Sequence, residues 1–241
     1  MRNGSLVFVG LVGMMISACG GGEDAAMPGT VSSVQAQSAV SGSVMLRSAV
    51  DTMEGAQIAA AVLQVNASTS GIVTPQGAGT TKGLTSENVE TVTQAQTSGM
   101  QSCTAAGCTF TDYSTGGSTL NGRVDVADAG DGAKSIKWDL TIEGSGLGAA
   151  AGGFGFNYNA KGDVTVSMTA LNGEVHTVAT VSGSNQGQSY EGGYTADVRY
   201  QSIVLSNGKP TGGSIWAKVT STGSSGGQTQ SQAYEGTHTF N

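Results

Sequence analysis

Three aspartates in the middle of the chain are spaced closely enough to suggest a divalent cation. Asp125, Asp128 and Asp131 fall within seven residues, and carboxylate oxygens are ligands that Ca²⁺ prefers. Calcium loops of the EF-hand type carry ligands at every second position and close with a bidentate Glu, and this stretch has neither feature. We therefore favour the alternative, in which the three aspartates are solvated side chains of a hairpin loop.

The two histidines, His176 and His238, offer acid–base chemistry without a complete catalytic set. Each lies in a segment of alternating apolar and polar residues, which predicts a strand. Serine-hydrolase chemistry needs a nucleophile, a base and an orienting acid, and nothing in the sequence links either histidine to such partners. The histidines also lack the paired spacing to cysteines that zinc sites have. We expect no enzyme activity, no metal and no cofactor.

Cys19 ends an N-terminal segment that has the features of an export signal. Arg2 gives a positive start, an apolar run of eleven residues begins at Leu6, and two small residues come directly before the cysteine. A membrane-spanning helix needs about 20 apolar residues, so this run is too short to cross a bilayer stably. Residues 1–18 are expected to be a signal peptide that is removed.

The sequence Ile16-Ser17-Ala18-Cys19 resembles the lipobox of bacterial lipoproteins, although Ile16 stands where Leu is commoner. The resemblance implies that Cys19 is acylated and becomes the first residue of the mature protein. Gly20 follows where Asp would imply retention in an inner membrane, so the family pattern implies the outer membrane, facing the periplasm or the cell surface. The alternatives are a plain secretory signal and an uncleaved anchor. The resemblance covers the first two dozen residues and implies no activity.

Cys103 and Cys108 are the other two cysteines. In an exported chain two thiols this close in sequence most often pair, and Gly107 lets the loop between them turn back. A thioredoxin-like redox pair would instead have two intervening residues beside the start of a helix. We therefore expect a structural disulfide.

Composition excludes one class of partner and limits the core. The net charge is -7 and only ten Lys and Arg residues are present, scattered along the chain, so no basic patch for nucleic acid is visible. Apolar residues make up 38% and aromatic residues 5% of the chain, alongside 39 glycines. Such a composition predicts a thin core built on the face of a sheet.

Strict alternation recurs from about residue 108 to the end and predicts half-buried strands. The runs 119–126 and 136–142 should pair as a hairpin, with Asp131-Gly132 favouring the reversal. Further turns are expected at 171–174 and 206–210. Short connections without helices imply antiparallel pairing. The expected fold is mainly β, an antiparallel meander of about eight strands that forms an open curved sheet, a sandwich or a barrel.

One N-terminal helix, over residues 43–66, is expected to pack on this sheet. Apolar residues recur there at three- to five-residue steps and three successive alanines favour helix, although Gly55 weakens its middle. The segment before it, 19–42, is expected to be a flexible tether, and 67–100 to be rich in loops with one strand near 89–92. The antiparallel β domain then occupies 101–241.

These observations leave three functions from different classes. The favoured one is a non-catalytic cell-envelope lipoprotein, attached to the membrane through its N-terminal acyl anchor, whose β domain has a structural or protein-interaction role. The second is a periplasmic carrier of lipid or another hydrophobic ligand, with a pocket between helix and sheet. The third is a small outer-membrane β-barrel, against which the scarcity of aromatic residues and the lipobox both argue.

Overall fold

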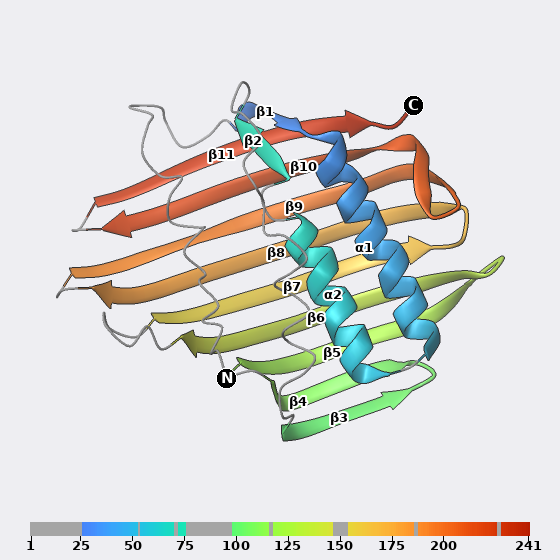
Figure 1. The fold of residues 1–241 in the computed structure, drawn as a ribbon, viewed down its shortest axis with the longest axis horizontal. Coiled ribbons are helices and arrows are strands. Elements are labelled where there is room, and N and C mark those ends of the chain that lie inside the picture. Colours follow the sequence, from blue (N-terminus) through green and yellow to red (C-terminus); the bar gives the residue numbers. More distant parts are fainter. Residues whose placement is uncertain are drawn as a thin grey trace, which may run out of the picture.

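Eleven strands lie side by side in one open, curved sheet, and two helices cover one of its faces (Figure 1). The structure is a computed structural model that describes residues 26–52, 54–69, 72–75, 98–115, 118–146, 154–185, 188–225 and 228–241. The helices are α1 (Ser33–Thr52) and α2 (Gly55–Thr69). The strands are β1 (Met27–Val31), β2 (Val73–Pro75), β3 (Ser98–Thr104), β4 (Gly107–Thr115), β5 (Ser118–Gly130), β6 (Ala133–Gly146), β7 (Phe154–Val166), β8 (Ala170–Asn185), β9 (Gln188–Ser206), β10 (Lys209–Ser225) and β11 (Gln228–Thr239).

The strands from β3 to β11 form an antiparallel meander, as the alternating pattern predicts. The meander has more strands than the eight expected, and two further strands come from the N-terminal part of the chain. β1 pairs in parallel with β11, and β2 pairs antiparallel with β1. The sheet order therefore runs from β2 at one edge to β3 at the other, and of the three forms left open by the sequence the structure shows the open curved sheet.

Two of the three expected turns are confirmed. Asp131-Gly132 and Asn207-Gly208 join β5 to β6 and β9 to β10, and all four residues have positive φ, between 50° and 74°. The turn expected at 171–174 is wrong, because β8 runs through it and Gly173 forms a bulge with φ 132°. The chain reverses earlier, at 167–169, where the Ser167 amide donates to the Ala170 carbonyl at 2.8 Å.

The single helix expected over 43–66 is in fact a pair, α1 and α2, that begins at Ser33. Ser32 caps α1. Its hydroxyl accepts a hydrogen bond from the backbone N–H of Gln35 at 3.2 Å and donates one to the side-chain oxygen of Gln35 at 2.8 Å. The segment 19–42, expected to be a tether, therefore contains β1 and the start of α1. In the loop-rich segment 67–100, α2 extends to Thr69, and the strand expected near 89–92 lies outside the described residues.

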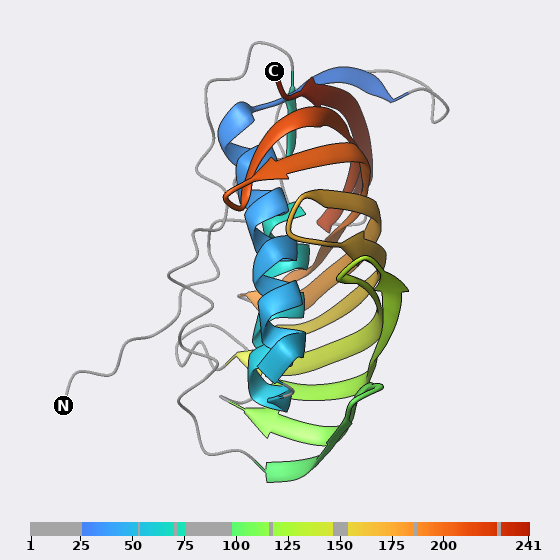
Figure 2. The ribbon, with the colours of Figure 1, turned by 90° about the vertical axis from the view of Figure 1, so that its right-hand side faces the viewer.

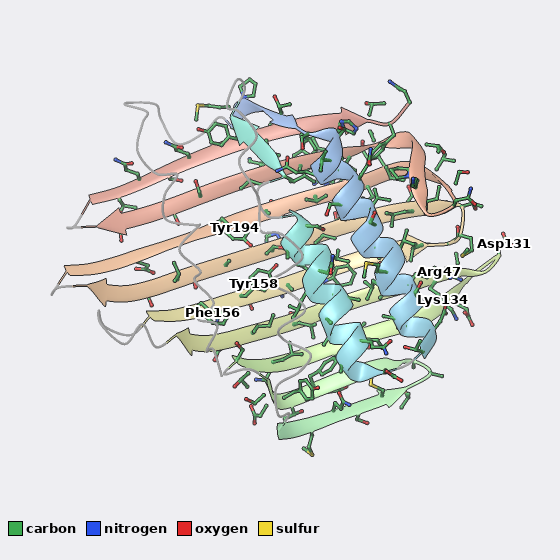
Figure 3. The ribbon with its side chains drawn as sticks, in the orientation of Figure 1. Arg47, Asp131, Lys134, Phe156, Tyr158 and Tyr194 are labelled. Atoms are coloured by element: carbon green, nitrogen blue, oxygen red, sulfur yellow. A yellow bond between two sulfur atoms is a disulfide. The ribbon has the colours of Figure 1, made fainter. Side chains whose placement is uncertain are left out.

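The two helices run antiparallel, and the sheet curves around them (Figures 1 and 2). At Gly42 a Cβ atom would lie 3.3 Å from the Val65 backbone, so this glycine lets α1 and α2 approach closely. The Arg47 side chain ties α1 to the tip of the β5–β6 hairpin by donating to the Gly132 carbonyl at 3.1 Å (Figure 3). The core consists of aliphatic side chains from both helices and from the covered face of the sheet, among them Leu46, Ile58 and Leu140.

The expected disulfide between Cys103 and Cys108 is confirmed and closes the β3–β4 hairpin at one edge of the sheet. The two residues face each other directly across the strands, with their Cα atoms 4.1 Å apart. A Cβ atom at Gly55 would lie 2.9 Å from the Cys103 sulfur. The start of α2 therefore packs against the disulfide, which joins the edge hairpin to the helices.

Tyr200 carries a hydroxyl into the interface between α1 and the sheet. It is 3% exposed, and its hydroxyl donates to the Ala39 carbonyl at 3.2 Å. Burial raises the pKa of Tyr200 to about 12, while a hydrogen bond with Ser43 partly opposes the shift. The neutral phenol is thus the form that the folded protein accommodates.

Stability should therefore fall in alkaline solution. Because the folded-state pKa lies above the unfolded value near 10, this contribution is complete below pH 10 and is lost as the pH rises through 12. Urea titrations of the wild type should show a fall of about 1 kcal/mol per pH unit in that window. Tyr200→Phe should show a shallower fall, and equal slopes for the two proteins would contradict this account.

Candidate functional site

The face of the sheet turned away from the helices carries a belt of charged side chains. Figure 2 shows that neither α1 nor α2 lies on this face. Because side chains alternate along each strand, the apolar residues point toward the helices and the charged ones point away from them. The charged belt consists of Arg123, Asp125, Lys137, Asp139, Lys161, Asp163, Glu174, His176, Asp197, Arg199, Lys218 and Glu235.

The register of the strands places these charges in two rows that cross the sheet. The first row runs from β5 to β11, and each member is the direct cross-strand partner of the next: Arg123, Asp139, Lys161, His176, Asp197, Lys218 and Glu235. Apart from the histidine, the signs of charge alternate along this row. The second row, two residues along each strand, begins with Asp125, Lys137 and Asp163. Opposite charges directly across strands attract each other, so the first row is favourable as it stands.

Ion pairs hold the belt in order. Lys161 lies 3.0 Å from Asp139, and Lys137 lies 2.7 Å from Asp163. The hydrogen bond and the charge of Asp163 raise the pKa of Lys137. All four side chains are about half exposed, and ion pairs of this kind add little to stability. The belt is therefore better suited to presenting charges at a surface than to holding the fold together.

A groove of about 420 Å³ lies at the centre of the belt, across β6, β7, β8 and β9. Its ionisable lining residues are Asp139, Lys161, Asp163, Glu174, His176, Asp197 and Arg199. His176 Nδ1 lies 2.7 Å from the Asp197 carboxylate, so the imidazole is fixed in position. No hydroxyl or thiol of the described residues lies within hydrogen-bond distance of His176. The arrangement can bind polar or charged groups.

A network of amides and hydroxyls flanks the belt on the same face. The Thr141 hydroxyl donates to Asn159 at 2.9 Å, Asn159 donates to Asn157 at 2.7 Å, and Asn157 donates to Glu143 at 2.9 Å. These bonds connect β6 and β7 across the open face. The surface next to the groove is thus polar, ordered and rich in hydrogen-bonding groups.

The opposite, helix-bearing face contains an aromatic group beside α2. Figure 3 shows Phe156, Tyr158 and Tyr194 together on β7 and β9. Tyr158 and Tyr194 face the neighbouring Ala179 from either side, and burial raises the pKa of Tyr158 well above its usual value. Phe156 and Tyr158 are partly buried and pack against the core. This region combines apolar rings with hydroxyl groups at the end of the covered core.

The residues singled out by the sequence do not form one site. Of the calcium candidates, Asp125 pairs with Arg123 at 3.2 Å and Asp128 pairs with Lys134 at 2.6 Å. Asp131 occupies the β5–β6 turn. Within the ranges that the structure describes, no group of three or more His, Cys, Asp or Glu side chains is placed to hold a metal ion.

The two histidines are separated by the fold, and Cys19 lies outside the described residues. His176 lines the groove, whereas the His238 ring packs on the Phe240 ring at a centroid distance of 4.8 Å. Of the sequence candidates, only Asp125 and His176 belong to the charged belt, and His176 alone reaches the groove.

The groove residues other than His176 were not expected from the sequence. Their signal is a pair of opposite charges at positions i and i+2 of the sequence, as in Lys161 with Asp163 and Asp197 with Arg199. That spacing places both charges on the same, polar face. What the sequence could not supply is the cross-strand register that aligns the pairs into a belt.

Comparison with protein-family models, with curated proteins and with solved structures found no match to this chain. No helix of the described residues is long and apolar enough to span a membrane.

Proposed function

We propose that this protein is a non-catalytic lipoprotein of the bacterial cell envelope whose β domain binds another envelope protein through the open face of its sheet. The N-terminal sequence supports acylation at Cys19 and attachment to the outer membrane. Attachment through acyl chains leaves the open face of the sheet available for interaction.

The observation that carries this proposal is the charged belt with the groove at its centre. The belt is ordered by ion pairs on a rigid antiparallel sheet, so it meets a partner without much loss of side-chain freedom. Charged and polar groups arranged on such a surface provide specificity and orientation for a partner. The groove adds a concave feature into which a side chain of the partner can fit.

Site-specific crosslinking in cells tests the proposal. A photoreactive benzoylphenylalanine is placed at Thr180, which is exposed on β8 on the open face, or at Val34, which is 75% exposed on α1. We expect position 180 to crosslink to a discrete envelope protein and position 34 not to do so. Crosslinks from position 34 alone, or from neither position, would contradict an interaction through the open face.

A second candidate function is the carriage of a lipid or another hydrophobic ligand. It is favoured by the partly buried aromatic side chains Phe156 and Tyr158 at the end of the core beside α2, where their apolar rings suit the apolar part of such a ligand. Mass spectrometry of residues 20–241, purified without detergent, distinguishes the candidates. A stoichiometric lipid would favour the carrier, and its absence together with a crosslink from position 180 would favour the interaction module.

A further inference from the structure

The alternation of charge in the belt breaks at one place. In the second row, Asp163 on β7 lies directly opposite Glu174 on β8. Two like charges facing each other across adjacent strands are destabilising. The unfavourable pair lies within the groove. A pair that breaks the charge complementarity of an otherwise complementary surface tends to fall at a functional site.

The neighbours of this pair compensate one carboxylate and leave the other largely to solvent. Asp163 lies 2.7 Å from Lys137. Glu174 faces Arg199 on β9, but the distance from its carboxylate to the guanidinium is 3.9 Å, which is longer than a hydrogen bond. The Arg199 guanidinium instead lies over the Trp216 ring, 4.8 Å from its centroid, and the Glu174 side chain is 70% exposed.

The groove as a whole is also richer in carboxylates than in fixed cations. Its lining contains Asp139, Asp163, Glu174 and Asp197 against Lys161 and Arg199. A group that enters the groove is therefore favoured if it carries positive charge. The groove crosses four strands, which correspond to about 14 Å, or the length of roughly four extended residues. Lys161 and Arg199 are available as donors to main-chain carbonyls of such a segment.

From this geometry we infer that the groove docks a basic segment of the partner protein, with a Lys or Arg side chain held between Asp163 and Glu174. The inference rests on the proposed function and specifies the chemistry of its partner. The incoming cation replaces the repulsion between the two carboxylates with two attractive contacts. The like-charge pair thus lowers the stability of the free protein and raises its affinity for a basic partner.

Peptide binding to the full-length protein, purified in detergent, tests this inference. The probes are a ten-residue peptide of alternating Lys and Ser and a counterpart of alternating Glu and Ser, with affinity measured by fluorescence anisotropy at two salt concentrations. Glu174→Gln removes the exposed carboxylate at nearly constant size. Glu54→Gln is the matched control, since Glu54 is an exposed carboxylate between α1 and α2, outside the belt and the groove.

The wild type should bind the Lys peptide more tightly than the Glu peptide. Glu174→Gln should weaken this binding about tenfold, as expected for a lost hydrogen bond to a charged group, while Glu54→Gln leaves it nearly unchanged. Glu174→Gln should also raise the thermal unfolding midpoint, because it removes the like-charge pair. A merely structural glutamate would not combine weaker binding with higher stability.

Three results would overturn the inference: equal weakening by both variants, tighter binding of the Glu peptide, or a lower midpoint for Glu174→Gln. The outcomes separate this inference from the proposed function. If position 180 crosslinks to a partner but Glu174→Gln binds the Lys peptide like the wild type, the result supports an interaction through the open face and contradicts the docking of a basic segment in the groove. If position 180 gives no crosslink, the proposed function itself fails.

Discussion

Replacing Gly162 by valine is expected to lower the free energy of unfolding by about 3 kcal/mol or more. A Cβ atom at this position would lie 2.1 Å from Cζ2 of Trp138, the cross-strand partner of Gly162 on β6. Trp138 is 3% exposed, so its ring has no solvent into which it can move. The added side chain must displace either the ring or the strand, and both are costly in a closely packed core.

A second glycine on β7 provides a control for the loss of stability expected at Gly162. Gly155 also lies on β7, but the nearest atom to a Cβ there is the Ser182 hydroxyl at 3.9 Å. Gly155→Val should leave the urea midpoint unchanged or raise it slightly, because β-branched residues suit strands. Equal losses at the two glycines would show that the cost lies in the backbone rather than in contact with the indole.

A second change isolates the contact itself. The indole Nε1 of Trp138 has no hydrogen-bond partner among the described residues, so Trp138→Leu removes packing without breaking a hydrogen bond. In the Gly162→Val background this substitution should cost less than it does in the wild type, or even recover stability. The coupling energy from the double-mutant cycle should be of the order of 1 kcal/mol or more. Additive effects would contradict a direct clash.

Local periodicity was sufficient to predict the hairpin strands. The alternation in 119–126 and 136–142 sets which side chains face the core, and a shift of one residue would turn every one of them to the wrong side. The observed register pairs Leu120 with Ile142 and Val124 with Trp138, apolar with apolar. The same reasoning misplaced the turn at Gly173, because a glycine with positive φ serves a bulge as readily as a turn.

The N-terminal elements were harder to predict, for two physical reasons. The helices bury small and polar residues as well as apolar ones, including Ala36, Ala39 and Ser43 at 0% exposure, which blurs the apolar stripe on which a helix prediction depends. The capping pair Ser32 and Gln35 was visible in the sequence and marks the true start of α1. The parallel pairing of β1 with β11 joins residues at opposite ends of the chain, and no local pattern encodes it.

The candidate site was predictable in composition and not in geometry. Opposite charges two residues apart on successive strands are evident in the sequence, and they indicate an exposed polar face. The position of the like-charge pair depends on the alignment of Asp163 with Glu174, which is set by the 167–169 turn that the sequence did not reveal. The like-charge pair of Asp163 and Glu174 can therefore be recognised only once the strand register is known.

Replacing Cys19 by alanine is expected to abolish acylation and to release the protein from the membrane fraction. The reason is chemical, since the thiol is the only group of the lipobox-like sequence that can accept the lipid as a thioether. Labelled palmitate should enter the wild type and not the variant. Cys103→Ser is the matched control: it removes another cysteine, lowers stability by breaking the disulfide, and should leave the label in place.

The same variant tests whether Cys19 holds the sheet at a membrane. Only seven residues separate Cys19 from Met27, the first residue of β1, so even a fully extended connection spans at most about 28 Å. If Cys19 is acylated, the side of the sheet formed by β1 and β2 lies close to the bilayer, and the crosslink expected from position 180 should depend on Cys19. Continued labelling of the alanine variant would contradict acylation at this residue. Loss of the label with the crosslink retained would show that the partner recognises the open face without membrane attachment.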